Sequence, residues 1–397
     1  MTTESTMSQT QPKIGLMLTG GGARAAYQVG VLKAIAEFMP RRTQCPFQVI
    51  CGTSAGALNA VTLAVNARHF RKGVKYLLGI WTSSQVTDIY RSDLLGVAAN
   101  SGRWLAGLIL SLLGINRMRR VSLLDNSPLA TFLEETLPCE QIQENIDAGA
   151  LHALSITASG YSSGHSVTFY QGVPELQPWK RTRRLGVEAS IGIEHLMASA
   201  AIPFIFPAVH IHREYFGDGS VRQIAPISSA LHLGADKVLL MGAWHKDDEE
   251  ERRNKVDTYP TLAQIAGHAL DSIFLDSLEV DLERLQRIND AVKLIPEELR
   301  AATKLRHIDV LVITPSQPLE KIAERYISQL PWTIRLLLRS IGVMRRSGAN
   351  LVSYLLFDKQ YCRALIDLGY QDALKRRDEI LCFLGYDTAT PGCDMPQ

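Results

Sequence analysis

The hydrophobic positions of this chain fall into short apolar runs that alternate with longer amphipathic segments. Residues 14–19 and 47–51 are apolar runs with the length of a buried parallel strand, and helical patterns follow them over 23–38 and 55–66. Glycines stand between each run and its helix. Two strand–turn–helix units in succession predict a parallel sheet that is covered by helices.

The pattern continues with two helical regions and several further strands. Residues 67–150 and the chain after 319 have mostly helical patterns. Strands are predicted at 153–159, 166–170, 238–243 and 309–314, with a helix at 193–201, an extended stretch at 208–211 and a turn-rich segment at 213–220. The prediction is an α/β fold with three layers, α/β/α, around a mainly parallel central sheet. A helical insertion and a helical C-terminal region complete it.

Composition narrows the class of protein without fixing its activity. The 397 residues are 46% hydrophobic and 21% charged, which is typical of a globular protein with a full core. A formal net charge of +2 argues against nucleic acid as a partner. The six cysteines are scattered, so we expect free thiols, no metal site and no disulfide framework. Residues 1–12 predict a disordered lead-in without a secretory signal, and no apolar run reaches the length of a membrane span. A cytoplasmic protein is therefore expected.

The first candidate for chemistry is Ser54, in the sequence Gly52-Thr53-Ser54-Ala55-Gly56. A serine on a sharp turn between a strand and a helix has an exposed hydroxyl near the positive end of that helix. The flanking positions must be small, which explains Gly52 and Gly56. The pattern predicts a serine hydrolase with Ser54 as nucleophile, and the alternative is a structural turn with a capping serine.

A second candidate is the glycine loop Gly20-Gly21-Gly22-Ala23-Arg24, between the first strand and its helix. Consecutive glycines allow backbone N–H groups to converge on an anionic oxygen, as an acyl-transfer intermediate requires. Arg24 would add charge there or hold the loop in place. The competing interpretation is a dinucleotide-binding loop, but that fold places an acidic residue where the second strand here runs into Gly52 and Ser54.

The base that would activate Ser54 is less clearly marked. A histidine triad would draw on His232, His245, His268 or His307, and none of them stands in a distinctive context. The alternative base is Asp218, between Gly217 and Gly219, where a rigid turn would present a carboxylate. Taken alone, this Asp-Gly pair is also an ordinary turn.

The order of these motifs resembles the patatin-like phospholipase family. Besides the glycine loop, the Ser54 turn and the Asp218 turn, the stretch Met197–Pro203 with Phe206-Pro207 is similar to the family's small-residue helix and proline turn. The tail, with Ser353–Phe357 and Leu368–Tyr370, is similar to longer bacterial members. Ser220 departs from the glycine or alanine that usually ends the third motif.

The resemblance implies lipid acyl hydrolysis by a Ser–Asp dyad, without metal or organic cofactor. Ser54 would be the nucleophile, Asp218 the base, and Gly20, Gly21, Gly22 and Arg24 the oxyanion hole. The catalytic domain would span 13–243, with the helical insertion at about 67–150, and 244–397 would hold the last strand and the helical C-terminal region. A triad esterase acting on soluble esters or thioesters, and a catalytically idle lipid-binding relative, remain the alternatives.

Two segments predict peripheral contact with a membrane that carries the phospholipid or other acyl-lipid substrate. Residues 105–115 contain no charge, and arginines flank them on both sides within 103–120. In 331–346, Ile334, Leu337, Leu338 and Ile341 follow a helical stripe opposite Arg335 and Arg339. The alternative for both segments is a helix packed over the sheet with its arginines in solvent.

Overall fold

The computed structural model describes residues 12–83, 85–91, 102, 122–243, 245, 262–300, 303, 305–340 and 349–386. Its centre is one mixed sheet of ten strands. Eight of them lie in the order β10 (Asp309–Ile313), β9 (Lys237–Met241), β1 (Ile14–Leu18), β2 (Val49–Thr53), β3 (Ala153–Gly160), β4 (Ser166–Gly172), β6 (Arg184–Glu188) and β5 (Trp179–Arg181). Two more, β7 (Val209–Ile211) and β8 (Glu214–Asp218), pair with each other, and β8 also pairs with β3.

The five strands from β10 to β3 run parallel, and β4 turns back antiparallel to β3. Alternate residues of a strand face opposite sides of the sheet. In β1, Leu16 and Leu18 therefore join one hydrophobic core, whereas Met17 joins a second core on the other face. Burial on both faces is the reason that these strands read as continuous apolar runs. The predicted α/β fold with a mainly parallel sheet is confirmed.

Most helices cover the first face of the sheet, and α9 (Ile227–His232) and α11 (Ser277–Leu294) cover the second. The first-face helices before the last strand are α1 (Ala26–Phe38), α2 (Ala55–Val65), α3 (Phe70–Ser83), α4 (Val86–Ile89), α6 (Ser127–Thr136), α7 (Gln141–Asp147), α8 (Ile193–Ser199) and α10 (Leu262–Asp271). After it come α13 (Leu319–Glu324), α14 (Trp332–Ser340), α15 (Ala349–Leu355), α16 (Lys359–Lys375) and α17 (Arg377–Phe383). Shorter turns are η1 (Gly22–Ala25), η2 (Gly219–Arg222), the π-helical η4 (Ser272–Asp276), α12 (Glu297–Arg300) and η5 (Ile327–Gln329).

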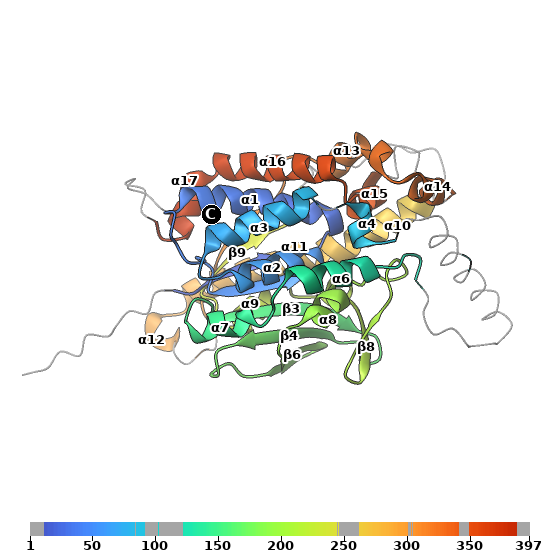
Figure 1. The fold of residues 1–397 in the computed structure, drawn as a ribbon. Helices are drawn as coiled ribbons and strands as arrows, with labels where there is room; N and C mark the ends of the chain where they lie inside the picture. The colour runs from blue at the N-terminus through green and yellow to red at the C-terminus, as the bar shows by residue number, and fades with distance from the viewer. Residues whose placement is uncertain are drawn as a thin grey trace, which may run out of the picture.

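The C-terminal region is built into the same core as the N-terminal half. Helix α16 lies along α1 in Figure 1, and the two helices pack closely. Two glycines make this approach possible: a Cβ on Gly30 would lie 2.0 Å from the Ile366 oxygen, and one on Gly369 would lie 2.1 Å from the Tyr27 oxygen. The segment after the last strand therefore covers the helix that follows the glycine loop.

Several local predictions were wrong in their details. The second strand is β2 at 49–53 and not 47–51, because Gly52 and Thr53 still pair with β3. The segment predicted as turn-rich contains β8. Gly217 lies inside β8, and a Cβ at this position would lie 2.5 Å from the Tyr161 hydroxyl oxygen. The glycine therefore leaves room for the tyrosine side chain. The strands β5 and β6 were missed, since their short and basic sequence lacks an apolar pattern.

The cysteines follow the expectation in part. Cys45, Cys51, Cys139 and Cys362 are free thiols, whereas Cys382 is engaged in a disulfide. In the described part of the chain, no helix is both long and apolar enough to cross a lipid bilayer.

The close contact between α1 and α16 can be tested with Gly369→Ala. The added methyl group would meet the Tyr27 backbone, so we expect the free energy of unfolding to fall by about 1–3 kcal/mol. Gly79→Ala in α3 is the matched control, because nothing lies within 4 Å of its Cβ position, and it should raise stability by about 0.5–1 kcal/mol. Chemical denaturation of both variants measures the difference. Equal stability of the two would contradict the packing described here.

Candidate active site

Strand β3 brings Ser54 and Asp218 together. Its Thr157 pairs with Thr53, the last residue of β2, and its next residue, Ala158, pairs with Asp218, the last residue of β8. One edge of β3 is paired with β4 as far as Ser159. Strand β8 therefore pairs with the other edge, beyond the point where β2 ends. The chain turns away from the sheet at Ser54, and Asp218 arrives at the next position along the same edge.

Ser54 lies on a tight and strained turn. Its backbone has φ 54° and ψ −129°, a left-handed conformation that is costly for a residue with a side chain. The neighbouring glycines are required by space: a Cβ on Gly52 would lie 2.6 Å from the Ala57 Cα, and one on Gly56 would lie 2.3 Å from the Leu18 oxygen. The geometry is that of the strand–turn–helix motif predicted from the sequence.

Ser199, at the end of α8, holds this turn in place. Its hydroxyl accepts a hydrogen bond from the Ser54 N–H at 2.8 Å and donates one to the Thr157 carbonyl at 2.7 Å. The same side chain therefore ties the strained residue to the strand that aligns it with Asp218. No sequence pattern predicts this role of Ser199, since its position in a small-residue helix gives no sign of a distant partner.

Asp218 is fully buried, which raises its pKa to about 6 by desolvation. The Ser54 hydroxyl and the backbone and hydroxyl of Ser220 act in the opposite direction and lower the pKa. The Ser220 N–H donates to Oδ1 at 2.9 Å, whereas Oδ2 makes no hydrogen bond of ordinary geometry with a described residue. Ser220, the departure from the family pattern, thus supports the carboxylate directly.

The glycine loop is packed tightly beside these two residues. A Cβ on Gly20 would lie 2.7 Å from the Ser220 hydroxyl oxygen and 2.9 Å from the Phe274 ring, and one on Gly22 would lie 2.2 Å from the Tyr354 oxygen. Gly21 and Gly22 also have φ of 155° and 55°, which favour glycine. Among the described residues, none accepts a hydrogen bond from the N–H of Gly20, Gly21 or Gly22.

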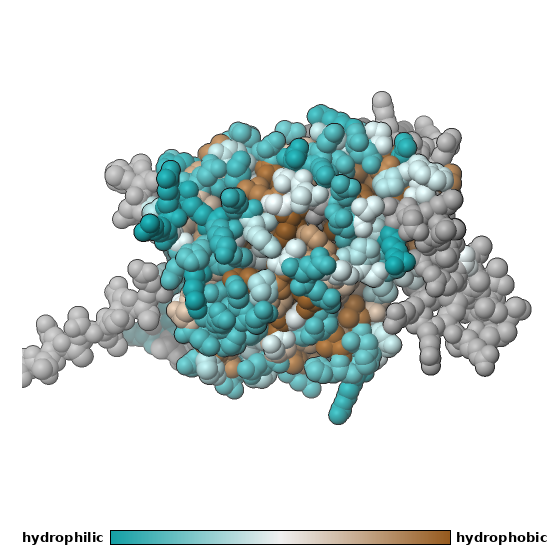
Figure 2. Space-filling model, in the orientation of Figure 1, coloured by the Kyte–Doolittle hydropathy of each residue, from teal (hydrophilic) through white to brown (hydrophobic). Residues whose placement is uncertain are grey.

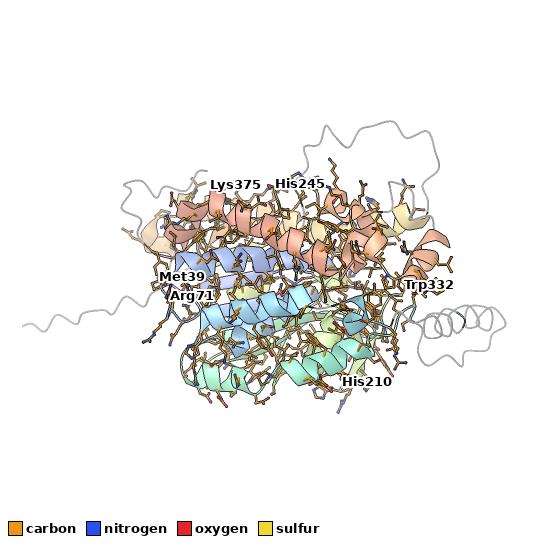
Figure 3. All side chains as sticks on the ribbon, turned by 45° about the horizontal axis from the view of Figure 1, so that its top comes forward. Met39, Arg71, His210, His245, Trp332 and Lys375 are labelled. Atoms are coloured by element: carbon orange, nitrogen blue, oxygen red, sulfur yellow. The ribbon has the colours of Figure 1, made fainter. Side chains whose placement is uncertain are left out.

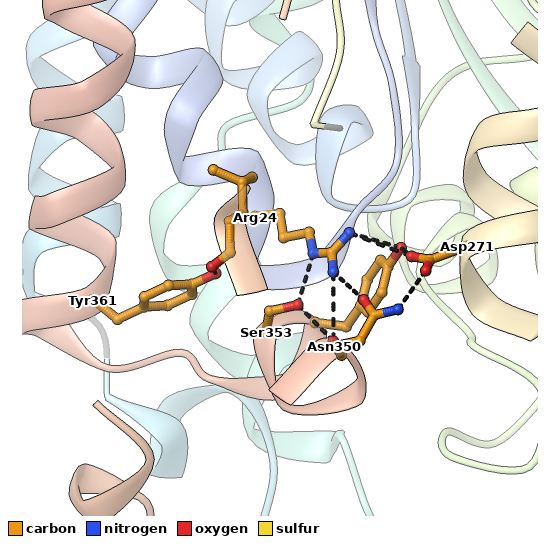
Figure 4. A network of polar contacts seen from close by, with 7 residues as sticks. Arg24, Asp271, Asn350, Ser353 and Tyr361 are labelled. Atoms are coloured by element: carbon orange, nitrogen blue, oxygen red, sulfur yellow. Dashed lines mark hydrogen bonds and ion pairs between the residues drawn. The ribbon is translucent and has the colours of Figure 1, made fainter. Parts of the chain in front are cut away.

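Arg24 is buried in a network that belongs to the C-terminal region (Figure 4). Its Nε donates to the Ser353 hydroxyl at 2.7 Å, its Nη1 donates to the Tyr354 hydroxyl at 3.0 Å, and its Nη2 donates to the Asn350 side chain. The guanidinium pairs with Asp271 at 3.5 Å and lies 3.9 Å from the Tyr354 ring centre. Burial disfavours its charge, but Tyr354 and Asp271 outweigh this effect and the pKa is raised.

This network identifies what Arg24 does to the loop. With its donors engaged by α15 and by the end of α10, the side chain anchors the loop to the C-terminal region. The partners on α15 stand more than three hundred residues away in the sequence, so no local pattern indicates them.

An apolar cavity opens at Ser54. Figure 2 shows hydrophobic side chains in the middle of one face. The empty space of the cavity and of its open mouth together is about 730 Å³, and the centre of a water-sized sphere can occupy about 60 Å³ of it. Gly22 and Ser54 form its polar end. The walls are almost entirely hydrophobic and come from α2, α3, α4, α6, α8 and the loops beside them, including Leu58, Ile80, Trp81, Leu129, Leu133, Leu196, Ile202, Phe206 and Phe357. No local sequence pattern predicts these walls, because the residues that form them come from segments distant in the chain.

Two of the histidines considered for a triad, His232 and His307, lie elsewhere. His232 stacks on Trp179, and burial together with two arginines lowers its pKa to about 4. His307 pairs with Asp309 at the start of β10, the end of the strand remote from the site. Within the described ranges, no histidine hydrogen-bonds to Ser54 or lines the cavity. No group of three or more His, Cys, Asp or Glu residues among those described could hold a metal ion.

Comparison with known protein families gives one match. The sequence model of a family described as "Patatin-like phospholipase" matches residues 16–231. No curated protein sequence matches significantly.

Two solved structures are similar at low identity. VipD from Legionella pneumophila is 14% identical with a TM-score of 0.31, and the match covers 90% of this chain and 67% of that one. A human GIVD cytosolic phospholipase A2, in complex with methyl gamma-linolenyl fluorophosphonate, is 14% identical with a TM-score of 0.40. That match covers 94% of this chain and 58% of the human one, so this chain corresponds to little more than half of its length.

The buried carboxylate predicts a pH-dependent effect of Asp218→Asn on stability. Because its pKa is raised from 3.8 to about 6, ionised Asp218 destabilises the fold above that pH, and the cost disappears below about pH 4. At pH 7.5 we expect the free energy of unfolding of the variant to exceed that of the wild type by up to about 3 kcal/mol, measured by chemical denaturation. The advantage should vanish at pH 4. An advantage that does not change with pH would contradict the assigned pKa.

Proposed function

This chain belongs to the patatin-like phospholipase family, and we propose that it hydrolyses acyl esters of lipids with Ser54 as nucleophile and Asp218 as base. The observation that carries the proposal is the convergence of three features: a serine on a strained turn, a buried carboxylate of raised pKa beside it, and an apolar cavity that begins at the serine. Membership of the family supports lipid hydrolysis in general, and the proposal adds which residues act as nucleophile and base.

In the proposed reaction, Ser54 attacks the carbonyl carbon of the ester while its proton passes to Asp218. A carboxylate with a pKa of about 6 is ionised at neutral pH and still basic enough to accept that proton in the transition state. The alcohol part of the lipid leaves with the proton, and water then attacks the acyl-serine. Asp218 serves both steps, so the proposal needs neither histidine nor metal nor organic cofactor.

The developing oxyanion would be bound by the glycine loop. The N–H groups of Gly20, Gly21 and Gly22 are without partners among the described residues and belong to a loop pressed against Ser220 and Tyr354. Such preorganised donors stabilise the charge that appears in the transition state. Arg24 takes part as a positioning residue, since its guanidinium is held by Ser353, Tyr354 and Asp271.

The cavity favours an apolar acyl chain as the group bound next to Ser54. Burial of apolar surface contributes roughly 25 cal/mol per Å² to binding, and the cavity walls offer almost no polar partner for another kind of group. A soluble ester with a small acyl group would leave most of the apolar cavity wall in contact with water. Phospholipids and other acyl lipids are therefore the proposed substrates.

Peripheral contact with a membrane is part of the proposal. The segments 103–120 and 341–346 lie outside the described residues. In α14, Ile334 is buried in the core, whereas Trp332 and Leu336 are 56% and 59% exposed. Figure 3 places Trp332 at the same end of the molecule as His210, away from Met39. We propose a cytoplasmic enzyme that meets anionic lipid through these segments.

The dyad is tested by three substitutions and a fluorophosphonate probe. Ser54→Ala should abolish both labelling and ester hydrolysis, and Asp218→Asn should reduce hydrolysis by at least about a hundredfold, as loss of a general base does. His232→Ala should keep most of the activity, because that ring stacks on Trp179 on another part of the sheet. Labelling is read by in-gel fluorescence and hydrolysis by release of fatty acid. A folded wild type that is not labelled would favour the catalytically idle alternative.

The basic flank of 103–120 predicts salt-sensitive binding to lipid. Replacing Arg117, Arg119 and Arg120 by Gln removes three positive charges, each worth about 1 kcal/mol at an anionic surface. Co-sedimentation with phosphatidylglycerol vesicles should fall in this variant at low salt, and the difference should disappear at high salt. Wild-type binding that does not respond to salt would contradict a role for these charges.

A further inference from the structure

The loop 201–207, here called the Phe204 loop, connects three parts of the proposed site. At its start, the Ala201 carbonyl accepts the backbone N–H of Asp218 at 2.9 Å. Further along, Ile202 and Phe206 are buried and line the apolar cavity. The loop therefore lies between the candidate base and the wall of the acyl cavity, and any contact made at its tip is made beside the cavity.

Phe204 stands at that tip and points into solvent. It is 78% exposed, more than any other described aromatic residue. Its backbone has φ 66°, a left-handed conformation that is rare for a bulky residue and unfavourable in energy. A glycine or asparagine would fit this backbone better. The side chain thus weakens the fold and makes little contact within the described part of the protein, so a purely structural role does not account for it.

The rest of the loop is suited to an apolar surface. Its sequence, Ala-Ile-Pro-Phe-Ile-Phe-Pro, contains no charged or hydrogen-bonding side chain. The carbonyls of Phe204 and Ile205 accept the N–H groups of Leu123 and Leu124 at 2.9 Å each, and the N–H groups of Ile205 and Phe206 both donate to the Ile202 carbonyl. Backbone groups that are paired within the protein avoid the high cost of unpaired polar groups in hydrocarbon.

Two tyrosines extend this surface at the end of the sheet where the site lies. The β3–β8 ladder ends with Gly160 opposite Phe216, and just beyond it the Tyr161 N–H donates to the Tyr215 carbonyl at 2.9 Å. Both tyrosine side chains are 52% exposed. Aromatic rings with a polar end favour the boundary between lipid headgroups and acyl chains.

We propose that the Phe204 loop is the part of this enzyme that enters a phospholipid surface, with the Phe204 ring among the acyl chains. This inference rests on the proposed lipid hydrolysis and adds a contact that does not depend on charge. Insertion next to Ile202 and Phe206 brings the cavity mouth to the lipid, so that an acyl chain moves from bilayer to cavity without crossing water. An uncharged loop in which the Phe204 and Ile205 carbonyls are paired suits this occupant better than it suits a polar protein partner.

The experiment compares Phe204→Gly, Phe204→Trp and the wild type. Gly accepts a positive φ, so the first variant should fold with an unchanged or higher melting temperature, and Trp keeps an interfacial aromatic ring. Leu294→Ala is the matched control, because this residue is 85% exposed at the end of α11, near the strand ends remote from the site. Binding is measured by flotation with phosphatidylcholine vesicles at high salt. Activity is measured as the ratio of vesicle hydrolysis to hydrolysis of a monomeric short-chain ester.

We expect Phe204→Gly to lower both vesicle binding and the activity ratio by about tenfold or more, from the loss of one buried aromatic ring. Phe204→Trp and Leu294→Ala should stay near the wild type. Unchanged flotation of Phe204→Gly would overturn the inference, and so would an equal loss in Leu294→Ala or a loss that accompanies a lower melting temperature. If the wild type cleaves neither ester, the proposed hydrolysis fails, while flotation still decides whether Phe204 binds lipid.

Discussion

The shared edge of β3 is the constraint on which the site depends. A strand has one row of backbone groups on each edge, and β4 already uses one of these rows along most of β3. The other row is divided between β2 and β8, and the division falls between Thr157 and Ala158. Strand β2 must end before β8 can pair with β3, so Ser54 and Asp218 lie beside consecutive residues of β3. Backbone pairing thus sets their relation, and Ser199 fixes the strained turn within it.

Several energetically unfavourable features occur at and beside the candidate active site. Ser54 and Phe204 both have left-handed backbones, and Asp218 has no solvent contact. Each feature costs stability unless its surroundings hold it, and here the surroundings are the sheet, the glycine loop and the C-terminal helices. The C-terminal region is therefore more than an extension. Beyond the part that matches the family, residues 271 and 350–354 supply the partners of Arg24, which keeps the glycine loop against Tyr354.

Local sequence was a good guide where a motif is short and its geometry is nearly obligatory. The small residues around Ser54 and the consecutive glycines at 20–22 predict tight turns because a Cβ at these positions would overlap backbone atoms, as it does here at Gly56 and Gly22. The ends of strands were predicted less accurately. The sequence at Gly52 and Thr53 indicates a turn, but both residues belong to β2 because they pair with β3. The β5–β6 hairpin was missed for a similar reason: its pairing partner, and not its own pattern, makes it a strand.

The fold class, the two strand–turn–helix units and the candidate residues Ser54, Asp218 and Gly20–Gly22 could be predicted from local sequence, because they depend on periodicity and on space within a few residues. The contacts between distant segments depend on packing of the whole chain. That packing pairs Arg24 with Asp271 and Ser353 and places Ser199 against the Ser54 turn. It also lines an apolar cavity with side chains of α2, α3, α4, α6 and α8, and it raises the pKa of Asp218 by burial. Burial and long-range pairing arise only when the whole chain has packed, so no local pattern contains them.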